Sequence, residues 1–171
     1  MATASDTTQE ARYIAEFDAA LLDTPEWLRA LRSRAMDRFR MLGFPVGRRG
    51  NEYWKYTDVG PIARSEFTPE PANSAAVGSI PRGVSVINLR GAKGELAKVA
   101  QSHLGAHASF EYEAFTALNT ALFDDAVLIH VVEGVSIGKT LRIALHSTER
   151  TASHPRVLII AEPGSRLSVA L

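Results

Sequence analysis

The 171-residue sequence contains no cysteine. A chain without thiols has no disulfide framework and no thiolate nucleophile, and it offers no cysteine ligands to zinc or to an iron–sulfur cluster. Chemistry that depends on a soft metal would therefore need ligands from another chain. The absence of cysteine excludes zinc ribbons, cysteine-dependent enzymes and carriers that hold a cysteine-ligated cluster alone.

The sequence also lacks an excess of charge, because 19 lysines and arginines balance 19 aspartates and glutamates. No global field draws the chain to nucleic acid or to an anionic membrane. No apolar run approaches the roughly 20 residues of a membrane helix, and the polar start at residues 1–10 is unlike a secretory signal. Because 46% of the residues are hydrophobic, we expect a folded, soluble, cytoplasmic protein.

Helical signals dominate the beginning of the sequence. Thr7 and Glu10 have the spacing of a capping box, and Ile14, Phe17 and Leu21 then recur at helical intervals. We expect this first helix to stop near residue 23.

A second helix is predicted to follow at once. Thr24 is its expected cap and Pro25 its first residue, where the missing N–H costs nothing. Its end is predicted at Gly43. Its apolar side chains recur every three or four residues and form one stripe: Leu28, Leu31, Ala35, Phe39 and Leu42. The region 1–60 is therefore predicted to be a helical hairpin with a short extension.

The middle of the sequence is mixed. Residues 61–82 contain four prolines and no apolar periodicity, so we expect a connector. The next region, 83–125, is predicted to hold one strand and two modest helices. These three elements are expected at Val84–Leu89, Glu95–Leu104 and Tyr112–Phe123.

The last region, 126–171, has the period of two that is typical of strands. The expected strands are Val127–Val132, Leu141–His146, Val157–Ala161 and Arg166–Leu171. Similar turns carry Gly134 and Gly164, which are 30 residues apart. We therefore predict an α+β protein in which the helical hairpin precedes the opening rungs of a right-handed parallel β-helix, whose rungs must stack to bury their apolar faces. A jelly roll is the alternative.

The alternation of the last predicted strand continues to Leu171, the final residue. Folded domains normally cover or pair such a strand edge. We therefore expect the sequence to be a fragment or to need an obligate partner. A homodimer formed through this edge is a further possibility that the sequence leaves open.

Several patterns could carry chemistry. Residues 134–140 read G-V-S-I-G-K-T, but one residue is missing between the glycines of a phosphate-binding loop and a strand pattern follows, so we interpret them as a turn. His103 and His107 are interpreted as surface histidines at a helix end, because the glutamate of a zinc-binding helix is missing. The adjacent Asp124 and Asp125 are interpreted as turn residues.

Three other histidines lie in or beside the predicted strands. His130, His146 and His154 could converge as metal ligands together with Glu133 or Glu162, as in a cupin-like or β-helix enzyme. The closely spaced histidines and following carboxylate of a cupin are absent. This enzyme is the first alternative function.

A basic run offers a second alternative, an RNA-binding helix. Its arginines are close in sequence: Arg29, Arg32, Arg34, Arg38, Arg40, Arg48 and Arg49. Most of them lie off the apolar stripe. We therefore favour a solvated helix face paired with Glu26 or Asp37.

Three segments together are more specific. The first reads E-x-W-K-Y-T and comprises Glu52, Trp54, Lys55, Tyr56 and Thr57. The second, F-T-A-L-N-T-A-L-F, spans residues 115–123 and contains Asn119; the third comprises His154, Pro155 and Arg156. In content and order these segments resemble the SufD and SufB family, the scaffold subunits of the SUF iron–sulfur cluster assembly system. The N-terminal part of SufD is the most similar.

The resemblance implies a non-catalytic scaffold that works with a cysteine-bearing SufB-like subunit and a SufC-like ATPase, whose docking region is absent from this sequence. No catalytic, cofactor-binding or metal-binding residue is implied, and an iron–sulfur cluster is expected only in the full complex. Asp125 and Val157 depart from the family pattern. We expect the E-x-W-K-Y-T residues to act in packing, with Trp54 and Tyr56 buried and Glu52 paired with Lys55.

Overall fold

The computed structural model describes residues 4–22, 24–46, 52–71 and 73–171, without the side chains of residues 4–10 and 73. The chain divides into two compact units, which are described separately. Unit 1 comprises Met1–Pro69 and His107–Leu122, and unit 2 comprises Glu70–Ala106 and Phe123–Leu171. None of the described helices is both long and apolar enough to cross a membrane.

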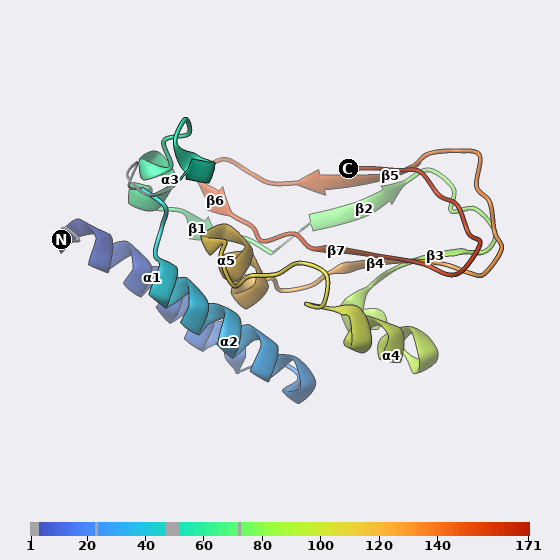
Figure 1. Ribbon diagram of the computed structural model, residues 1–171, viewed down its shortest axis with the longest axis horizontal. Coiled ribbons are helices and arrows are strands. Elements are labelled where there is room, and N and C mark those ends of the chain that lie inside the picture. Colours follow the sequence, from blue (N-terminus) through green and yellow to red (C-terminus); the bar gives the residue numbers. More distant parts are fainter. Residues whose placement is uncertain (1–3, 23, 47–51, 72) are drawn as a thin grey trace. The chain divides into compact units, whose positions relative to one another are not determined.

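Unit 1 is mainly helical (Figure 1). Its elements are α1 (Ala4–Leu21), α2 (Glu26–Leu42), the 3-10 helix η1 (Glu52–Trp54), α3 (Gly60–Arg64), the short strand β1 (Thr68–Pro69) and α5 (Ala114–Leu122). Helix α2 packs against α5, and α1 contacts α2, α3 and α5. The apolar faces of α1, α2 and α5 meet in one core, which includes the fully buried Met36, Phe39 and Ala117.

The predicted hairpin of helices is confirmed, but its start signals are not. Helix α1 already includes Ala4, so Thr7 lies inside the helix instead of capping it. Residue 23, the expected end, lies outside the described residues. Pro25, and not Thr24, is the N-cap residue of α2, and no side chain caps this helix. The Thr24 hydroxyl instead donates a hydrogen bond back to the carbonyl oxygen of Ala20 in the last turn of α1, at 2.9 Å.

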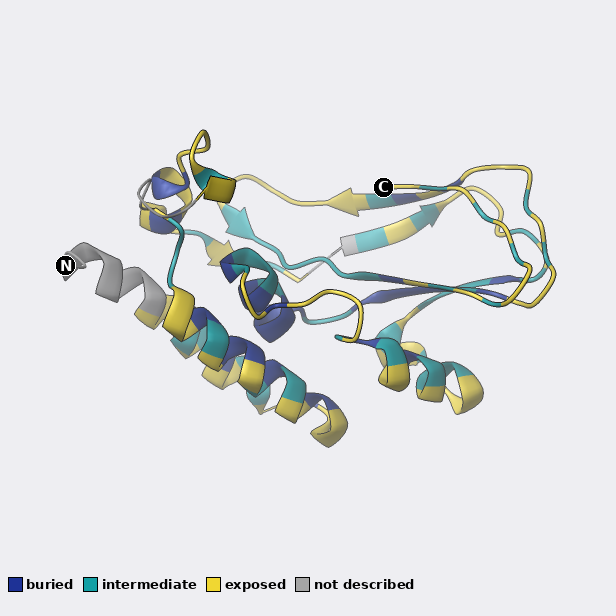
Figure 2. Ribbon diagram, viewed as in Figure 1, coloured by how far each residue is buried: buried dark blue, intermediate teal, exposed yellow. Residues whose placement is uncertain are grey.

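The apolar stripe of α2 is largely confirmed. Leu28, Ala35 and Phe39 are buried and Leu31 is partly buried, whereas Leu42 at the end of the helix is exposed. Figure 2 shows the alternation of buried and exposed positions along this helix. The helix ends at Gly43 with a φ of 61°, a left-handed conformation that glycine adopts without strain.

Unit 2 is built from two three-stranded sheets. The first has the strand order β2 (Asn73–Val77), β5 (Leu141–His146), β8 (Val169–Ala170); the second has the order β3 (Val84–Asn88), β4 (Val127–Val131), β7 (Val157–Ala161) (Figure 1). Apolar side chains from both sheets form one core. The remaining elements of the unit are η2 (Leu89–Gly91), α4 (Gly94–His103) and β6 (Thr151–Ala152).

Two successive segments of unit 2 stack in parallel. Val127 in β4 is paired with Val157 in β7, and Leu141 in β5 with Val169 in β8. Between these strands a parallel bridge joins Ser136 to Arg166. The chain therefore passes through the same two sheets twice, with equivalent positions about 30 residues apart, as expected for a repeating architecture.

The turns of the two segments stack as well. Gly134 and Gly164 have φ angles of 71° and 70°, so both need the left-handed conformation. The amide of Gly134 donates a hydrogen bond to the carbonyl oxygen of Pro163, at 3.0 Å. The similarity of the two turns, noted from the sequence, thus corresponds to a structural repeat.

Strands β2 and β3 run antiparallel to the first of the two stacked segments, β4 and β5. They lie on the opposite side of it from β7 and β8. Strand β2 pairs antiparallel with β5, and β3 pairs antiparallel with β4. The sequence predicted β3 but expected a connector over residues 61–82, where the structure has most of α3 and the strands β1 and β2. Strand β2 reads N-S-A-A-V and has no alternation of polar and apolar residues, so its sequence does not predict a strand. It forms a strand because it pairs with β5.

The outcome is a mixed α+β protein, as predicted. Helices α4 and α5 and strands β3, β4, β5 and β7 lie within a few residues of their predicted positions. Only residues 169–170 of the predicted strand Arg166–Leu171 form a strand, with Arg166 in an isolated bridge. The parallel pairs β4–β7 and β5–β8 are unlike the antiparallel sheets of a jelly roll.

One matched pair of substitutions tests the stacking. Ile129 and Ile159 are register partners in β4 and β7, but Ile129 is 0% exposed and Ile159 is 44% exposed. We expect Ile129→Ala to lower the free energy of unfolding of unit 2 by about 2.5 kcal/mol and Ile159→Ala by about 1 kcal/mol, since the cost follows the apolar surface that leaves the core. Amide hydrogen exchange of β4 measures both values. Equal losses in the two variants would contradict the difference in burial between Ile129 in β4 and Ile159 in β7.

Candidate functional site

The E-x-W-K-Y-T segment forms η1 and the turn after it, in unit 1. The Trp54 ring is half-buried and lies 5.1 Å from the Phe115 ring of α5, measured between centroids. The Lys55 ammonium is 3.5 Å from the Glu52 carboxylate, the expected ion pair. The Thr57 amide donates a hydrogen bond to the Trp54 carbonyl oxygen, at 3.0 Å, and closes the turn. Trp54 thereby attaches this segment to α5.

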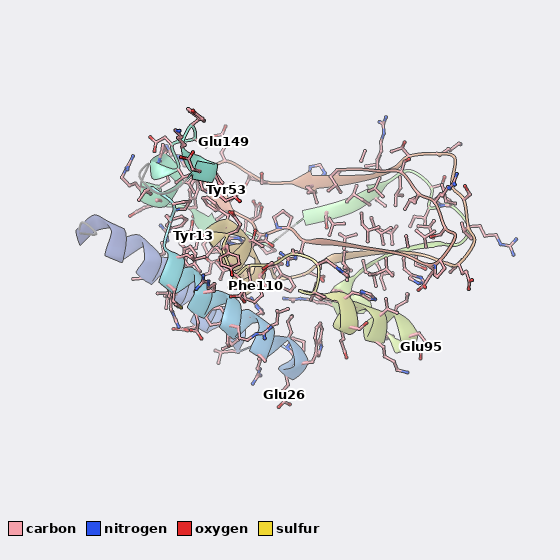
Figure 3. All side chains as sticks on the ribbon, in the orientation of Figure 1. Tyr13, Glu26, Tyr53, Glu95, Phe110 and Glu149 are labelled. Atoms are coloured by element: carbon pink, nitrogen blue, oxygen red, sulfur yellow. The ribbon has the colours of Figure 1, made fainter. Side chains whose placement is uncertain are left out.

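The expected burial of Tyr56 is wrong. Tyr56 is 92% exposed and Tyr53 is 87% exposed. Figure 3 labels Tyr53 at η1. The Lys55 ammonium lies 5.5 Å from the centroid of the Tyr56 ring. A tight 3-10 turn directs neighbouring side chains to different sides, so only Trp54 reaches the helices and the two tyrosines remain in solvent.

The second segment of the resemblance, residues 115–123, covers α5 and its end. Asn119 is half-buried on this helix, between the buried Leu118 and Thr120. Phe115 extends the aromatic contacts, because its ring lies 5.8 Å from the ring of Phe44. In unit 1 the first two segments of the resemblance therefore meet through Trp54 and Phe115.

The third segment, His154, Pro155 and Arg156, lies in unit 2 just before β7 and is half-buried. The Arg156 guanidinium is 5.9 Å from the centroid of the Phe123 ring. Burial lowers the pKa of Arg156. The Arg156 carbonyl oxygen accepts a hydrogen bond from the Val127 amide, at 2.9 Å, which begins the parallel pairing of β4 with β7.

The histidines of the enzyme alternative are only partly brought together with carboxylates. His130 Nε2 lies 3.0 Å from Glu162 Oε1, a pair that joins β4 to the turn after β7. His146 is exposed at the end of β5, and His154 is half-buried before β7. Over the part of the chain that the structure describes, no group of three or more His, Cys, Asp or Glu side chains could hold a metal ion.

Residues 134–140 do not have the context of a phosphate-binding loop. They form a turn and lead into the strand β5, whereas a phosphate-binding loop leads into a helix. Asp125 also has a local role: its carboxylate accepts hydrogen bonds from the amides of Arg90 and Ala126, at 3.1 and 2.8 Å. His103 is the last residue of α4, as expected of a helix-end histidine.

The arginines of α2 make contacts within unit 1. The Arg29 side chain donates a hydrogen bond to the Thr24 carbonyl oxygen, at 2.8 Å, and Arg38 donates one to the Glu111 carbonyl oxygen. Arg40 forms the expected ion pair with Asp37, at 3.0 Å. Arg48 and Arg49 lie outside the described residues. These arginines of α2 thus bind groups of unit 1 itself, which does not favour the RNA-binding alternative.

The prediction that the arginines of α2 lie on a solvated face is wrong for Arg32. It is 4% exposed, and its Nε donates a hydrogen bond to the Ala121 carbonyl oxygen of α5, at 2.6 Å. Its Nη1 donates a second hydrogen bond, to the Thr24 hydroxyl. Arg32 is therefore a buried connection between two helices, placed inside by the packing of α5 on α2.

Sequence reasoning also missed Glu70. Its carboxylate accepts hydrogen bonds from the Thr148 amide, at 3.0 Å, and from the hydroxyls of Thr148 and Thr151, at 3.1 and 2.6 Å. These bonds, the one from the Thr151 hydroxyl first, lower the pKa of Glu70. No sequence signal identifies this contact, because the partners are more than 70 residues apart.

Comparison with known proteins finds one family. A family model described as the SufBD protein N-terminal region matches residues 65–143, a little under half of the chain. The matched range includes the segment 115–123, whereas E-x-W-K-Y-T precedes it and His154–Arg156 follows it. No curated protein matches the sequence.

Proposed function

Because this chain carries a SufB/SufD family N-terminal region at residues 65–143, we propose that it is a non-catalytic scaffold subunit of SUF iron–sulfur cluster assembly. The family match is the observation that carries the proposal. It supports the resemblance that the sequence predicts over those residues. The proposed place of action is the cytoplasm.

The architecture of unit 2 supports a scaffold role. We propose that β4, β5, β7 and β8 form the opening rungs of a parallel β-helix, with β2 and β3 as an antiparallel cover on the first rung. Stacked rungs give a rigid, extended surface, which suits a protein that acts by association. The family-matched residues 65–143 contain the cover, β4 and the start of β5.

The absence of cysteine sets the division of labour in the proposed complex. Clusters and their precursors are held mainly by thiolates, which this chain does not have. A SufB-like partner would supply the cysteines, this chain would supply shape, and a SufC-like ATPase would drive rearrangement. In this assignment the chain resembles SufD more than SufB.

Anaerobic affinity purification tests the proposal. The full reading frame, tagged at its own locus, is isolated from the source cytosol and its stoichiometric partners are identified by mass spectrometry. We expect an ATPase together with a cysteine-containing relative of this chain, and neither of them with a tagged unrelated cytosolic protein. Recovery of the protein alone with stoichiometric metal would contradict the scaffold role and favour the metalloenzyme alternative.

A further inference from the structure

Unit 1 contains a polar cleft that the proposed scaffold role does not use. Its volume is about 390 Å³, near the lower end of the range for small-molecule sites. One wall is formed by α1 and the other by the end of α3 and the residues that follow it. The lining residues are Arg12, Tyr13, Glu16, Arg64, Ser65, Glu66 and Phe67.

The α1 wall combines a fixed aromatic ring with a half-buried carboxyl group. Tyr13 is 8% exposed, and its ring contacts those of Phe39 and Phe44 edge-on, so the base of this wall is held by the core. Arg12 donates a hydrogen bond to the Phe67 carbonyl oxygen, which joins the two walls. Burial raises the pKa of Glu16, and the Arg12 guanidinium only partly opposes this effect. A ligand cation would therefore stabilise the charge of the Glu16 carboxylate, which burial deprives of water.

The opposite wall carries a positioned guanidinium. Asp58 accepts a hydrogen bond from the Gly60 amide, at 2.9 Å, and fixes the start of α3. The Arg64 side chain folds back over Gly60, where a Cβ atom would lie 2.6 Å from Arg64 Nη1. Among the side chains that the structure describes, no carboxylate lies within ion-pair distance of this guanidinium. Glycine at position 60 thus leaves room for the guanidinium of Arg64, a residue that lines the cleft.

From these observations we infer that the cleft binds a small zwitterion of the α-amino acid class. Arg64 pairs with its carboxylate and Glu16 with its ammonium group, while the rings of Tyr13 and Phe67 accept an apolar side chain. Each wall carries one arginine and one glutamate, so the cleft presents both charges to a ligand that carries both. Charge-assisted hydrogen bonds are the strong ones. This inference is independent of the proposed scaffold role.

A titration of the full ¹⁵N-labelled chain with three related compounds tests the inference. L-Leucine carries both charges, N-acetyl-L-leucine lacks the ammonium group and L-leucinamide lacks the carboxylate. We expect L-leucine to shift the amide resonances of α1 and α3, and each of the other two compounds to bind about tenfold more weakly, the cost of one lost charge-assisted bond. Equal binding of all three compounds, or no shifts with millimolar L-leucine, would overturn the inference.

Variants locate the contacts. Arg64→Gln should remove the preference for L-leucine over L-leucinamide, and Glu16→Gln the preference over N-acetyl-L-leucine, each by about tenfold. Gly60→Ala keeps both charges but displaces the guanidinium, so it should reproduce the effect of Arg64→Gln. Arg40→Gln removes an arginine that pairs with Asp37 away from the cleft and should change nothing. Unchanged binding by both Arg64→Gln and Gly60→Ala would show that Arg64 is not the carboxylate site.

Discussion

Replacing Phe39 by alanine is expected to lower the free energy of unfolding of unit 1 by about 4 kcal/mol, the range for a large aromatic side chain removed from a packed core. Phe39 is 0% exposed, and its ring makes edge contacts with Tyr13 and Phe44, at centroid distances of 6.4 and 5.1 Å. Alanine would lose these contacts and leave a cavity where α1 and α2 meet. The loss is therefore both a transfer and a packing effect.

Intrinsic fluorescence measures this loss for unit 1 alone. Both tryptophans and all four tyrosines of the sequence lie in this unit. Urea unfolding followed by tryptophan emission therefore reports on the unfolding of unit 1. Tyr56→Ala is the matched control, since its ring is 92% exposed and its removal should cost less than about 0.5 kcal/mol. A comparable loss in both variants would mean that Phe39 does not lie in the core.

Arg32→Ala is expected to cost about 3.5 kcal/mol in the same assay, an unusually large effect for a charged residue on a helix. The substitution leaves the Ala121 carbonyl oxygen and the Thr24 hydroxyl without the hydrogen bonds that Arg32 donates, and it also opens a cavity. Both acceptors lie in a largely dry interior, where an unmade hydrogen bond costs the full desolvation of the group.

Two further variants separate the causes. Arg32→Met fills most of the space but donates no hydrogen bond, so we expect about 2 kcal/mol of the loss to remain. Arg40→Ala, on the same helix, removes an exposed ion pair with Asp37 and should cost less than about 0.5 kcal/mol. If Arg32→Ala proved as mild as Arg40→Ala, the burial of this guanidinium would be contradicted.

The contrast between Arg32 and its neighbours shows where sequence reasoning stops. Periodicity identified the apolar stripe of α2 because one helix face must leave water, and Leu28, Ala35 and Phe39 carry that signal themselves. The side of a helix on which a long arginine folds depends on its neighbours. Here α5 supplies a carbonyl oxygen, 89 residues away in sequence, and the arginine becomes internal.

In the candidate site, too, the features that depend on local sequence were predictable and those that depend on distant residues were not. The three segments of the resemblance were recognisable from residue types and order, and the ion pair between Glu52 and Lys55 follows from their spacing. The exposure of Tyr56 was not predictable, because it depends on the direction in which a short 3-10 turn presents each side chain. The polar cleft was not predictable either, since its two walls are more than 40 residues apart.

The sequence by itself determined the two helices at the beginning of the chain and the strands of its second half. It also determined the 30-residue recurrence of the glycine turns and the absence of thiol chemistry. These properties are local or compositional, so each is written in a single stretch of chain. Only the tertiary structure decided that β2 is a strand, that Arg32 is internal, that Glu70 joins a distant turn and that α1 and α3 enclose a charged cleft. Each of these depends on a partner far away in sequence, whose hydrogen bonds and packing outweigh the weak preferences of the local residues.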